Sequence, residues 1–312
     1  MKVLVFEFMT GGGVADQHPL NDELSDFLRQ GRSMLEAVCE DFLEIGAEVT
    51  VPIDSSIELS LSQPFGRLDV ARENELDSIL VAAAEHADHI LLIAPESEGC
   101  LAHFAERLSP WANRFISPDL EFIRLTGNKW NCHQWLVERA IPCPKTMLME
   151  PESAVTPGNL SFPLVAKPID GAGSEGVRMI ASEHQLAEIA RPFLVQQFIP
   201  GTAVSVSVIA DGDGNENILE PGRQIFDTEP FGVYLRAEFP LDSGLKVRAL
   251  NLAKKLVAAL PQTRGHFGID MVLGNSFNED FIIEINPRLT TSYVFLKQNS
   301  RNNLAAMMLA KQ

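Results

Sequence analysis

The first third of the chain alternates short apolar runs with stretches of helical periodicity, and this order limits the possible folds more than any other feature. Residues 3–8, 48–53 and 89–94 are rich in aliphatic and β-branched side chains, whereas residues 32–45 and 73–87 carry apolar residues at helical spacing. Strands that alternate with helices form parallel sheets, because each helix returns the chain to the same edge. The sequence therefore predicts an α/β domain with a small parallel sheet.

The pattern changes after about residue 115. A helix is expected over residues 128–140, with Asn128 as its N-cap. Short strands separated by turns then dominate, at residues 162–168, 177–181, 193–198, 204–210, 269–273 and 281–286. Helices interrupt them over residues 183–190 and 245–259. We expect an N-terminal α/β domain over residues 1–115 and an α+β remainder in two lobes, 116–194 and 195–312.

Composition and charge exclude several classes of partner. The 312 residues are 46% hydrophobic, which is ordinary for globular domains. A net charge of −17 argues against DNA, RNA or an acidic membrane as a partner, because phosphate groups are neutralised by clustered Lys and Arg. The sequence has no apolar run of membrane-spanning length, the apolar run at residues 3–6 is too short for a signal peptide, and the four cysteines form no CxxC pair. We expect a cytoplasmic protein with reduced thiols.

A glycine-rich stretch at residues 171–176, GAGSEG, matches GxGxxG literally. A dinucleotide-binding fingerprint needs a helix directly after the glycines, whereas a strand is expected here. The glycine-rich hairpin of protein kinases has its lysine after the loop, whereas Lys167 comes before this one. A hairpin of free N–H groups beside a lysine still suits phosphate. The alternative is a plain solvent-exposed hairpin.

Two lysines accompany this loop. Lys167 ends the apolar run at residues 163–166 and precedes Pro168, which would aim its amine consistently. The alternative is a lysine that reaches past the strand end to water. Lys129 opens the helix at residues 128–140 and reads as a surface lysine by itself. Its functional value depends on a pairing with Lys167.

Glu284 lies within an apolar strand, where a carboxylate without a partner is costly. If a hairpin turn is centred on Phe277, Asp270 lies opposite Glu284, and Gly268 lies opposite Asn286. Alternation places Glu284 and Asn286 on one face beside Asp270. Facing carboxylates repel unless a hard divalent cation such as Mg²⁺ lies between them. The alternative is a solvent-exposed polar face of the sheet.

Six stretches, taken in order, resemble the ATP-grasp superfamily. They are Asn128-Lys129-Trp130, VAKP at 165–168, the loop at 171–176, VQQFIPG at 195–201, GID at 268–270 and EINPR at 284–288. The resemblance implies an ATP-grasp fold, α/β and α+β, with a Rossmann-like N-terminal domain and two lobes that clasp ATP. Residues 6–13, 94–96 and 286–292 resemble small carboxylate–amine ligases of the tyramine–glutamate ligase and pyrrolysine-pathway ligase type.

The resemblance also implies roles for individual residues. ATP would be held by the two lysines, the loop and the linker between the lobes: Lys129, Lys167, Gly171, Gly173, Ser174, Gly176, Gln196, Gln197, Phe198 and Ile199. Mg²⁺, for which Mn²⁺ can substitute, would be held by Asp270, Glu284 and Asn286. Arg288 and Lys167 would be catalytic, with Arg288 neutralising the transferring phosphoryl group.

The implied reaction joins a small carboxylate, glutamate or another amino acid, to an amine through an acyl phosphate. The implied partners are small molecules, and a homodimer is compatible with the family. Many members have an acid for the ribose a few residues after the linker, where this chain has Thr202 and Ala203. This departure keeps open the alternative of a non-catalytic nucleotide-binding or regulatory protein. A third possibility is a phosphotransferase that stops at a phosphorylated product. Thr290 to Ser292 have no assigned role, and substrate specificity is expected to begin there.

Overall fold

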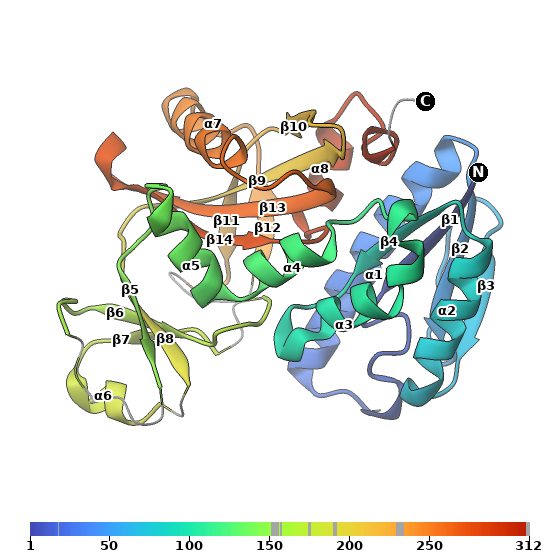
Figure 1. Ribbon diagram of the computed structural model, residues 1–312, viewed down its shortest axis with the longest axis horizontal. Coiled ribbons are helices and arrows are strands. Elements are labelled where there is room, and N and C mark those ends of the chain that lie inside the picture. The colour runs from blue at the N-terminus through green and yellow to red at the C-terminus, as the bar shows by residue number, and fades with distance from the viewer. Residues whose placement is uncertain are drawn as a thin grey trace.

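The computed structural model describes residues 1–17, 19–150, 156, 158–173, 176–189, 192–228 and 234–309. Three sheets form three bodies, with the N-terminal α/β body on the right of Figure 1 and the other two on the left. Ser174, expected to contact ATP, lies outside the described residues. None of the helices in the described ranges is both long and apolar enough to cross a membrane.

The N-terminal sheet is parallel throughout, as the alternating pattern predicts. Its strand order is β3-β2-β1-β4, with β1 at Lys2–Glu7, β2 at Glu48–Asp54, β3 at Gly66–Val70 and β4 at His89–Ile93. The strand β3 was not expected, because only its last residue is fully buried and its apolar signal is weak. The helices are α1 at Asp22–Glu44, α2 at Leu76–His86 and α3 at Cys100–Arg107, with short 3₁₀ turns at Ala15–Gln17, Glu73–Glu75, Ser97–Gly99 and Ser109–Arg114.

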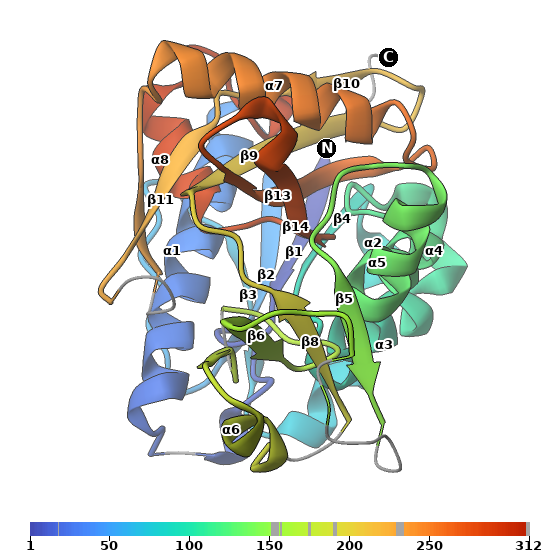
Figure 2. The ribbon, with the colours of Figure 1, turned by 90° about the vertical axis from the view of Figure 1, so that its left-hand side faces the viewer.

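The small lobe is an antiparallel sheet of order β5-β8-β6-β7. Its strands are β5 at Thr146–Met149, β6 at Leu164–Lys167, β7 at Arg178–Ile180 and β8 at Phe193–Gln197, and its helix α6 covers Glu183–Ala187. This lobe lies at the lower centre of Figure 2. Two helices, α4 at Leu120–Gly127 and α5 at Lys129–Glu138, lead from the N-terminal domain to this lobe. The lobe boundary expected at residue 194 falls inside β8, whose residues all belong to the small sheet.

The large sheet has six antiparallel strands in the order β12-β11-β9-β13-β14, with β10 paired to β9. The elements are β9 at Thr202–Asp211, β10 at Glu216–Ile218, β11 at Gly222–Phe226, β12 at Tyr234–Glu238, β13 at Arg264–Leu273, a 3₁₀ turn at Phe277–Glu279, β14 at Asp280–Asn286 and α7 at Ser243–Val257. Val204, Val206 and Val208 pack in one core with the buried side of α7. Strand alternation turns Ser205 and Asp270 to the opposite face.

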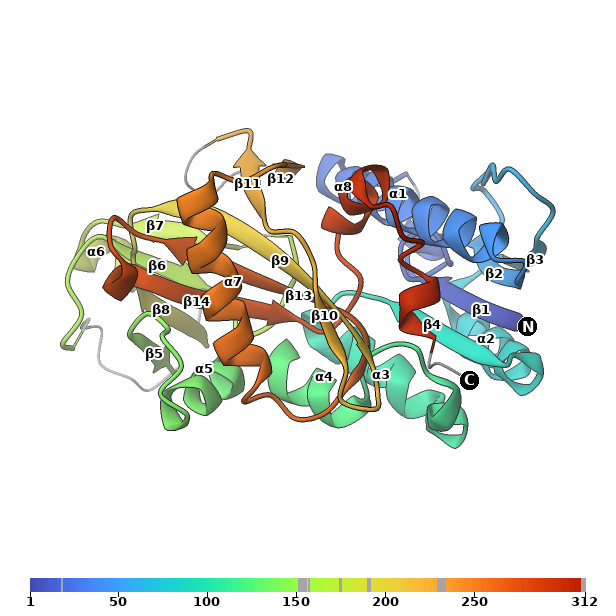
Figure 3. The same cartoon turned by 90° about the horizontal axis from the view of Figure 1, so that it is seen from above.

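The end of the described chain returns to the N-terminal domain. Helix α8 at Ser292–Asn299 lies beside α1, as Figure 3 shows, and a 3₁₀ turn at Ala306–Met308 follows it. The buried Tyr293 hydroxyl donates to Asp41, and Lys297 Nζ lies 2.6 Å from the same carboxylate. Residues 292–309 therefore share the core of the α/β domain.

Candidate active site

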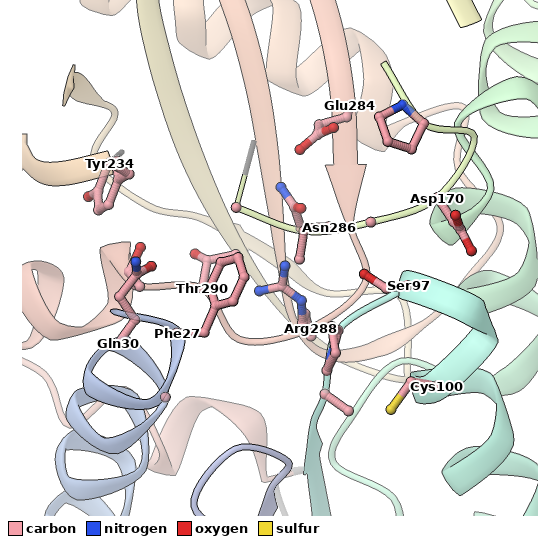
Figure 4. Close-up of a pocket in the computed structure, with 18 of the residues that line it drawn as sticks. Phe27, Gln30, Ser97, Cys100, Asp170, Tyr234, Glu284, Asn286, Arg288 and Thr290 are labelled. Atoms are coloured by element: carbon pink, nitrogen blue, oxygen red, sulfur yellow. The ribbon is translucent and has the colours of Figure 1, made fainter. Parts of the chain in front are cut away.

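A cavity of about 1310 Å³ is lined by residues from the N-terminal domain, the small lobe and the large sheet. All the site residues expected from the sequence line it where they are described, except Gly176. Figure 4 shows part of this cavity, with Glu284, Asn286 and Arg288 following one another along one side, and Phe27 and Gln30 reaching in from α1. The volume is sufficient for a nucleotide and further small molecules.

Lys129 is a cavity residue and not a surface lysine. Asn128 caps α5 by accepting a hydrogen bond from Asn131 N at 2.9 Å, which places Lys129 at the first helical position. Its Nζ donates to Gly171 O at 2.7 Å and lies 3.3 Å from Glu284 Oε2. Burial opposes the charge, but the Glu284 and Glu96 carboxylates outweigh it and hold the pKa of Lys129 above its ordinary value. The burial of Lys129 could not be predicted from its helix, because Glu284 belongs to β14, which is distant along the chain.

Lys167 ends β6 and is only 5% exposed. Its Nζ donates to Gln196 Oε1 at 3.0 Å, and Gln196 Nε2 donates in turn to Thr146 Oγ1 at 2.9 Å. Burial, together with the nearby charge of Lys129, lowers the pKa of Lys167 to about 8 despite the opposing carboxylate of Glu284. A buried lysine whose ammonium form is destabilised by burial is stabilised by an anionic ligand such as phosphate.

The linker between the lobes lines the cavity from Gln196 to Ile199. The Gln197 side chain turns away to Ser161, donating to its carbonyl at 3.0 Å and accepting from its N–H at 3.2 Å. The Gln197 N–H donates to Lys145 O at 2.9 Å, so neither this N–H nor the side chain is left for a ligand. Gly201 and Ala203 also line the cavity, and the chain has no acid from Phe198 to Ser205.

The backbone conformation of the glycine-rich loop favours glycine at three of its positions, 171, 173 and 176. Gly171, Gly173 and Gly176 have φ of +117°, +66° and +67°, which L side chains rarely adopt. A Cβ at Gly173 would lie 2.5 Å from the Phe27 ring of α1, and Asp170 Oδ2 accepts from Glu98 N at 2.8 Å. The loop therefore spans from the small lobe to the N-terminal domain. Gly176 does not line the cavity but packs against Pro168.

The hairpin of β13 and β14 has the expected register at the candidate site residues, whereas nearer the turn the pairing is shifted by one residue, with Met271 opposite Ile282. Asp270 pairs with Glu284 and Gly268 with Asn286, and a β-bulge follows directly after Asp270. Asp270 accepts from Asn286 Nδ2 at 2.9 Å through Oδ2 and from Gln224 Nε2 at 3.0 Å through Oδ1. The two carboxylates and the amide therefore meet on the cavity face of the sheet, and the plain solvent-exposed alternative is wrong.

The pKa values of the two carboxyl groups are shifted in opposite directions. Burial and the charge of Glu284 raise the pKa of Asp270 to about 7. Burial would raise that of Glu284 as well, but Lys129 and Lys167 hold the pKa of Glu284 below its ordinary value. Ionisation is therefore favoured at Glu284 and disfavoured at Asp270.

This set of groups fits a magnesium ion. A divalent cation would remove the repulsion that raises the pKa of Asp270, and carboxylate and amide oxygens are the ligands that Mg²⁺ prefers. In the described part of the chain, no three His, Cys, Asp or Glu side chains cluster as a metal cage. Two carboxylates and an amide suit an ion that keeps water and phosphate as its other ligands.

Arg288 is held by the N-terminal domain. Its Nε lies 3.1 Å from Glu96 Oε1, and its Nη2 donates to Glu96 Oε2 at 3.2 Å. The side chains are 12% and 4% exposed. A guanidinium fork held on one edge by a carboxylate keeps a fixed orientation and can still present its other N–H groups to the cavity.

Sequence reasoning assigned no role to several residues at the site, although Glu7 and Glu96 lie in stretches that carry the resemblance. These residues are Glu7, Phe27, Glu96, Gln224 and Tyr234, of which all but Glu96 line the cavity. A signal existed for Glu7, since an acid that ends an apolar parallel strand lies at the ligand-binding edge of such a sheet. Thr290 Oγ1 is buried without a hydrogen-bond partner in the described structure, and Thr290 to Ser292 line the cavity. This position is compatible with the expected role in specificity.

Comparisons with known proteins agree with this geometry. A family model for the ATP-grasp domain matches residues 126–292. Tyramine–L-glutamate ligase from Methanocaldococcus jannaschii is 27% identical over 305 residues, covering 95% of this chain and 85% of that protein. The 3-methyl-D-ornithine–L-lysine ligase from Methanosarcina mazei is 26% identical over 180 residues, covering 57% of this chain and 44% of that protein.

Solved structures show the same fold. A putative ATP-grasp superfamily protein from Archaeoglobus fulgidus aligns with a TM-score of 0.75 at 20% identity, covering 99% of this chain and 87% of that one. An L-amino acid ligase from Bacillus licheniformis aligns with a TM-score of 0.70 at 16% identity, covering 98% and 72%. The family model spans more than half of the chain and includes both lysines, the carboxylate pair and Arg288, so this chain belongs to the ATP-grasp family.

Proposed function

We propose that this protein is an ATP- and Mg²⁺-dependent ligase that joins a small carboxylate to an amine through an acyl phosphate. One observation carries the proposal. Two buried lysines, a pair of carboxylates with an amide, and a clamped arginine line one cavity, although they come from separate bodies of the fold. Phosphoryl transfer depends mainly on placing and neutralising charge, and this set of groups supplies both.

The small lobe and the linker provide the nucleotide site. Lys129 and Lys167 would contact the phosphates, and the backbone from Gln196 to Ile199 would face the adenine edge. The described glycines at 171 and 173 would close over the phosphates and limit the entry of water. Held by Asp270, Glu284 and Asn286, a magnesium ion would neutralise phosphate charge.

In the first step an oxygen of the substrate carboxylate attacks the γ-phosphorus. A bond forms between this oxygen and the γ-phosphorus. The bond from the γ-phosphorus to the oxygen that bridges it to the β-phosphorus breaks, and ADP leaves with that electron pair. Negative charge develops on the transferring group, next to Arg288 and Lys167. Groups already aimed at this position stabilise the transition state without further reorganisation.

In the second step the amine nitrogen attacks the carbonyl carbon of the acyl phosphate. A C–N bond forms, the C–O bond to phosphate breaks, and inorganic phosphate leaves. An ammonium ion loses one proton before attack and a second on collapse, one of which ends on phosphate. Arg288 would also neutralise the oxygen that bears charge in the tetrahedral intermediate.

The relatives suggest the class of substrate. One acts on tyramine and L-glutamate, and another joins two amino acids of the ornithine and lysine type, according to their names. We propose that the carboxylate is an amino acid such as glutamate and that the products are an amide, ADP and phosphate. Thr290 lines the cavity, and its buried hydroxyl has no hydrogen-bond partner among the described residues, which supports a contact of this hydroxyl with one of the substrates.

The test measures ADP release by purified protein with ATP, Mg²⁺ and a matrix of amino acids and amines. Hydroxylamine is included in a second series without amine, because it traps an acyl phosphate as a hydroxamate. ADP and amide should form in equal amounts with a correct pair. No hydroxamate with any carboxylate, in protein that binds ATP, would overturn the proposal.

The non-catalytic alternative is less well supported. It rests on the missing acid near Ala203, whereas the charged residues expected to act on phosphate or its metal ion, Lys129, Lys167, Asp270, Glu284 and Arg288, all line the cavity. If the protein only transfers phosphate, ADP release in the presence of the carboxylate should reach its full rate without an amine. Ligation predicts that amine accelerates turnover.

A further inference from the structure

Glu7 is a buried carboxylate for which the proposed reaction gives no role. It is the last residue of β1, lines the cavity and is 3% exposed. Its carboxylate accepts hydrogen bonds from Thr10 N at 2.8 Å, Thr10 Oγ1 at 2.7 Å and Met9 N at 3.2 Å. A carboxylate offers about four acceptor sites, so one is left for a further donor.

The charge of Glu7 is not balanced within the described structure. No ion pair to Glu7 occurs among the described residues, and the nearby Arg288 is already paired with Glu96. Burial raises the pKa of Glu7 against the lowering by Thr10, Met9 and Arg288. A buried carboxylate beside a cavity, without a counter-ion of its own, is a binding position for a cation.

Helix α1 is shaped around this carboxylate. A Cβ at Gly31 would lie 2.5 Å from the Glu7 carboxyl carbon, so the helix has a gap in its side chains there. Glycine inside a helix is unfavourable by about 1 kcal/mol relative to alanine, and here the missing side chain is the space that the carboxylate occupies. Gly31 itself lines the cavity.

The surface on both sides of the gap is apolar. Leu24, Phe27 and Met34 share a helix face with Gly31, because they follow one another at intervals of three and four residues. All three line the cavity, together with Met9 from the turn after β1. In Figure 4 Phe27 projects from α1 into the cavity. This surface suits an aromatic or aliphatic group next to a positive charge.

The rest of the N-terminal wall disfavours anions. The acids that this domain contributes to the cavity are Glu7, Glu23, Glu73, Asp77 and Glu98. Among the described lining residues before residue 115 there is no Lys or Arg. A ligand with its own carboxylate would meet repulsion on this side, whereas an ammonium would be attracted.

We propose that Glu7 binds the ammonium group of the amine substrate, and that this substrate is a primary amine whose other atoms are mainly apolar or aromatic. The inference rests on the proposed ligase function and deepens it. The ammonium held at Glu7 lies on the Arg288 side of the cavity, where the acyl phosphate would form. The apolar part of the amine would then lie against Leu24, Phe27 and Met34.

The test compares wild-type protein with Glu7→Gln, which keeps the shape and removes the charge. With 2-phenylethylamine as amine, we expect its KM to rise about 10- to 100-fold, because one partner of a buried charge pair is lost. The KM for ATP and the rate of hydroxamate formation with hydroxylamine should stay within about twofold, since hydroxylamine is neutral and small. Phenylalanine, which adds a carboxylate to the same amine, should be a poor substrate for both proteins.

Asp54→Asn is the matched control. Asp54 ends the neighbouring strand β2, is also 3% exposed and does not line the cavity. Loss of a buried carboxylate there should leave the KM for the amine unchanged. An equal rise in both variants would assign Glu7 a structural role and overturn the inference, as would an unchanged amine KM in Glu7→Gln.

Calorimetry separates this inference from the ligase proposal. Wild-type protein should bind 2-phenylethylamine and not the neutral 2-phenylethanol, and Glu7→Gln should lose this difference. Absence of hydroxamate in the wild type overturns the ligase proposal, while the binding difference still decides the role of Glu7. Equal binding of amine and alcohol by the wild type overturns the role of Glu7 even if the ligase reaction is found.

Discussion

Arg288 and Glu96, 192 positions apart in sequence, form a buried ion pair that joins the large sheet to the N-terminal domain, with Nε 3.1 Å from Oε1. Arg288 comes two residues after the last strand of the large sheet, and Glu96 follows the last strand of the N-terminal sheet. The pair fixes the guanidinium beside the groups expected to meet the phosphates. The N-terminal domain is therefore part of the site and not only an attached module.

Glu96→Gln should lower kcat while leaving the KM for ATP nearly unchanged. The neutral amide holds the guanidinium less firmly, and a misplacement of about 1 Å at a reacting centre costs on the order of 10- to 100-fold in rate. Steady-state ADP release measures both constants. Glu106→Gln is the control, because its pair with Arg124 is exposed and contributes little. An unchanged kcat for Glu96→Gln would contradict the orienting role.

Glu284→Gln should reduce turnover by about 10²- to 10³-fold and weaken the dependence on Mg²⁺. The substitution removes the charge that pairs with Lys129 and lowers the charge available to a divalent cation. Magnesium titration of ADP release measures the effect. Glu279→Gln, in the exposed turn of the same hairpin, keeps the local cap and should behave as wild type. Equal magnesium dependence in both variants would argue against a metal at this hairpin.

Asp270 should make the stability of the unliganded protein depend on pH. Burial and the charge of Glu284 raise its pKa from the ordinary value of 3.8 to about 7 in the folded state, so the folded protein binds more protons than the unfolded chain between these limits. Stability from this group is therefore present below about pH 4 and is lost as pH rises through about 7. Urea unfolding should show the wild type losing stability relative to Asp270→Asn across this window. If the free energies of unfolding of the two proteins changed with pH in parallel, the pKa of Asp270 would not differ between the folded and unfolded states, which would contradict the prediction.

Gly173→Ala should uncouple ATP use from amide formation. The added Cβ meets the Phe27 ring and forces a positive φ on alanine, so the loop cannot reach α1 as it does here. A loop that closes less well admits water to the acyl phosphate. The measurement is the ratio of amide to ADP, which should fall. Gly214→Ala tests backbone strain alone, since Gly214 also has positive φ but nothing within 4 Å of its Cβ position.

Much of the site could be predicted because it lies in short local patterns. The pairing of Asp270 with Glu284 was predicted from an assumed turn centred on Phe277, and strand alternation then places Glu284 and Asn286 on one face. The β-bulge between Asp270 and Met271 was not predicted, although the pairing depends on it. Nearer the turn Met271 pairs with Ile282, so an unbroken register would place Ile283 opposite Asp270, and the bulge brings Glu284 there instead. The expected lobe boundary at residue 194 falls inside β8, because the sequence of this strand carries no signal that marks where the small sheet ends.

Contacts across the bodies could not be predicted in the same way. Lys129 read as a surface residue from its helix alone, and its burial depends on Glu284 and Gly171 of other elements. The return of α8 to α1 through Tyr293 and Asp41 has no local signal either.

The sequence by itself determined the parallel N-terminal sheet, the metal-binding hairpin proposed at β14 and the order of family motifs, because periodicity and turn residues act over short distances. Only the tertiary structure decided that Glu96 holds Arg288 and that Glu7 lies in the cavity without a counter-ion among the residues that the structure describes. Charge pairing depends on which elements meet in space, and burial makes each such pairing or its absence energetically important.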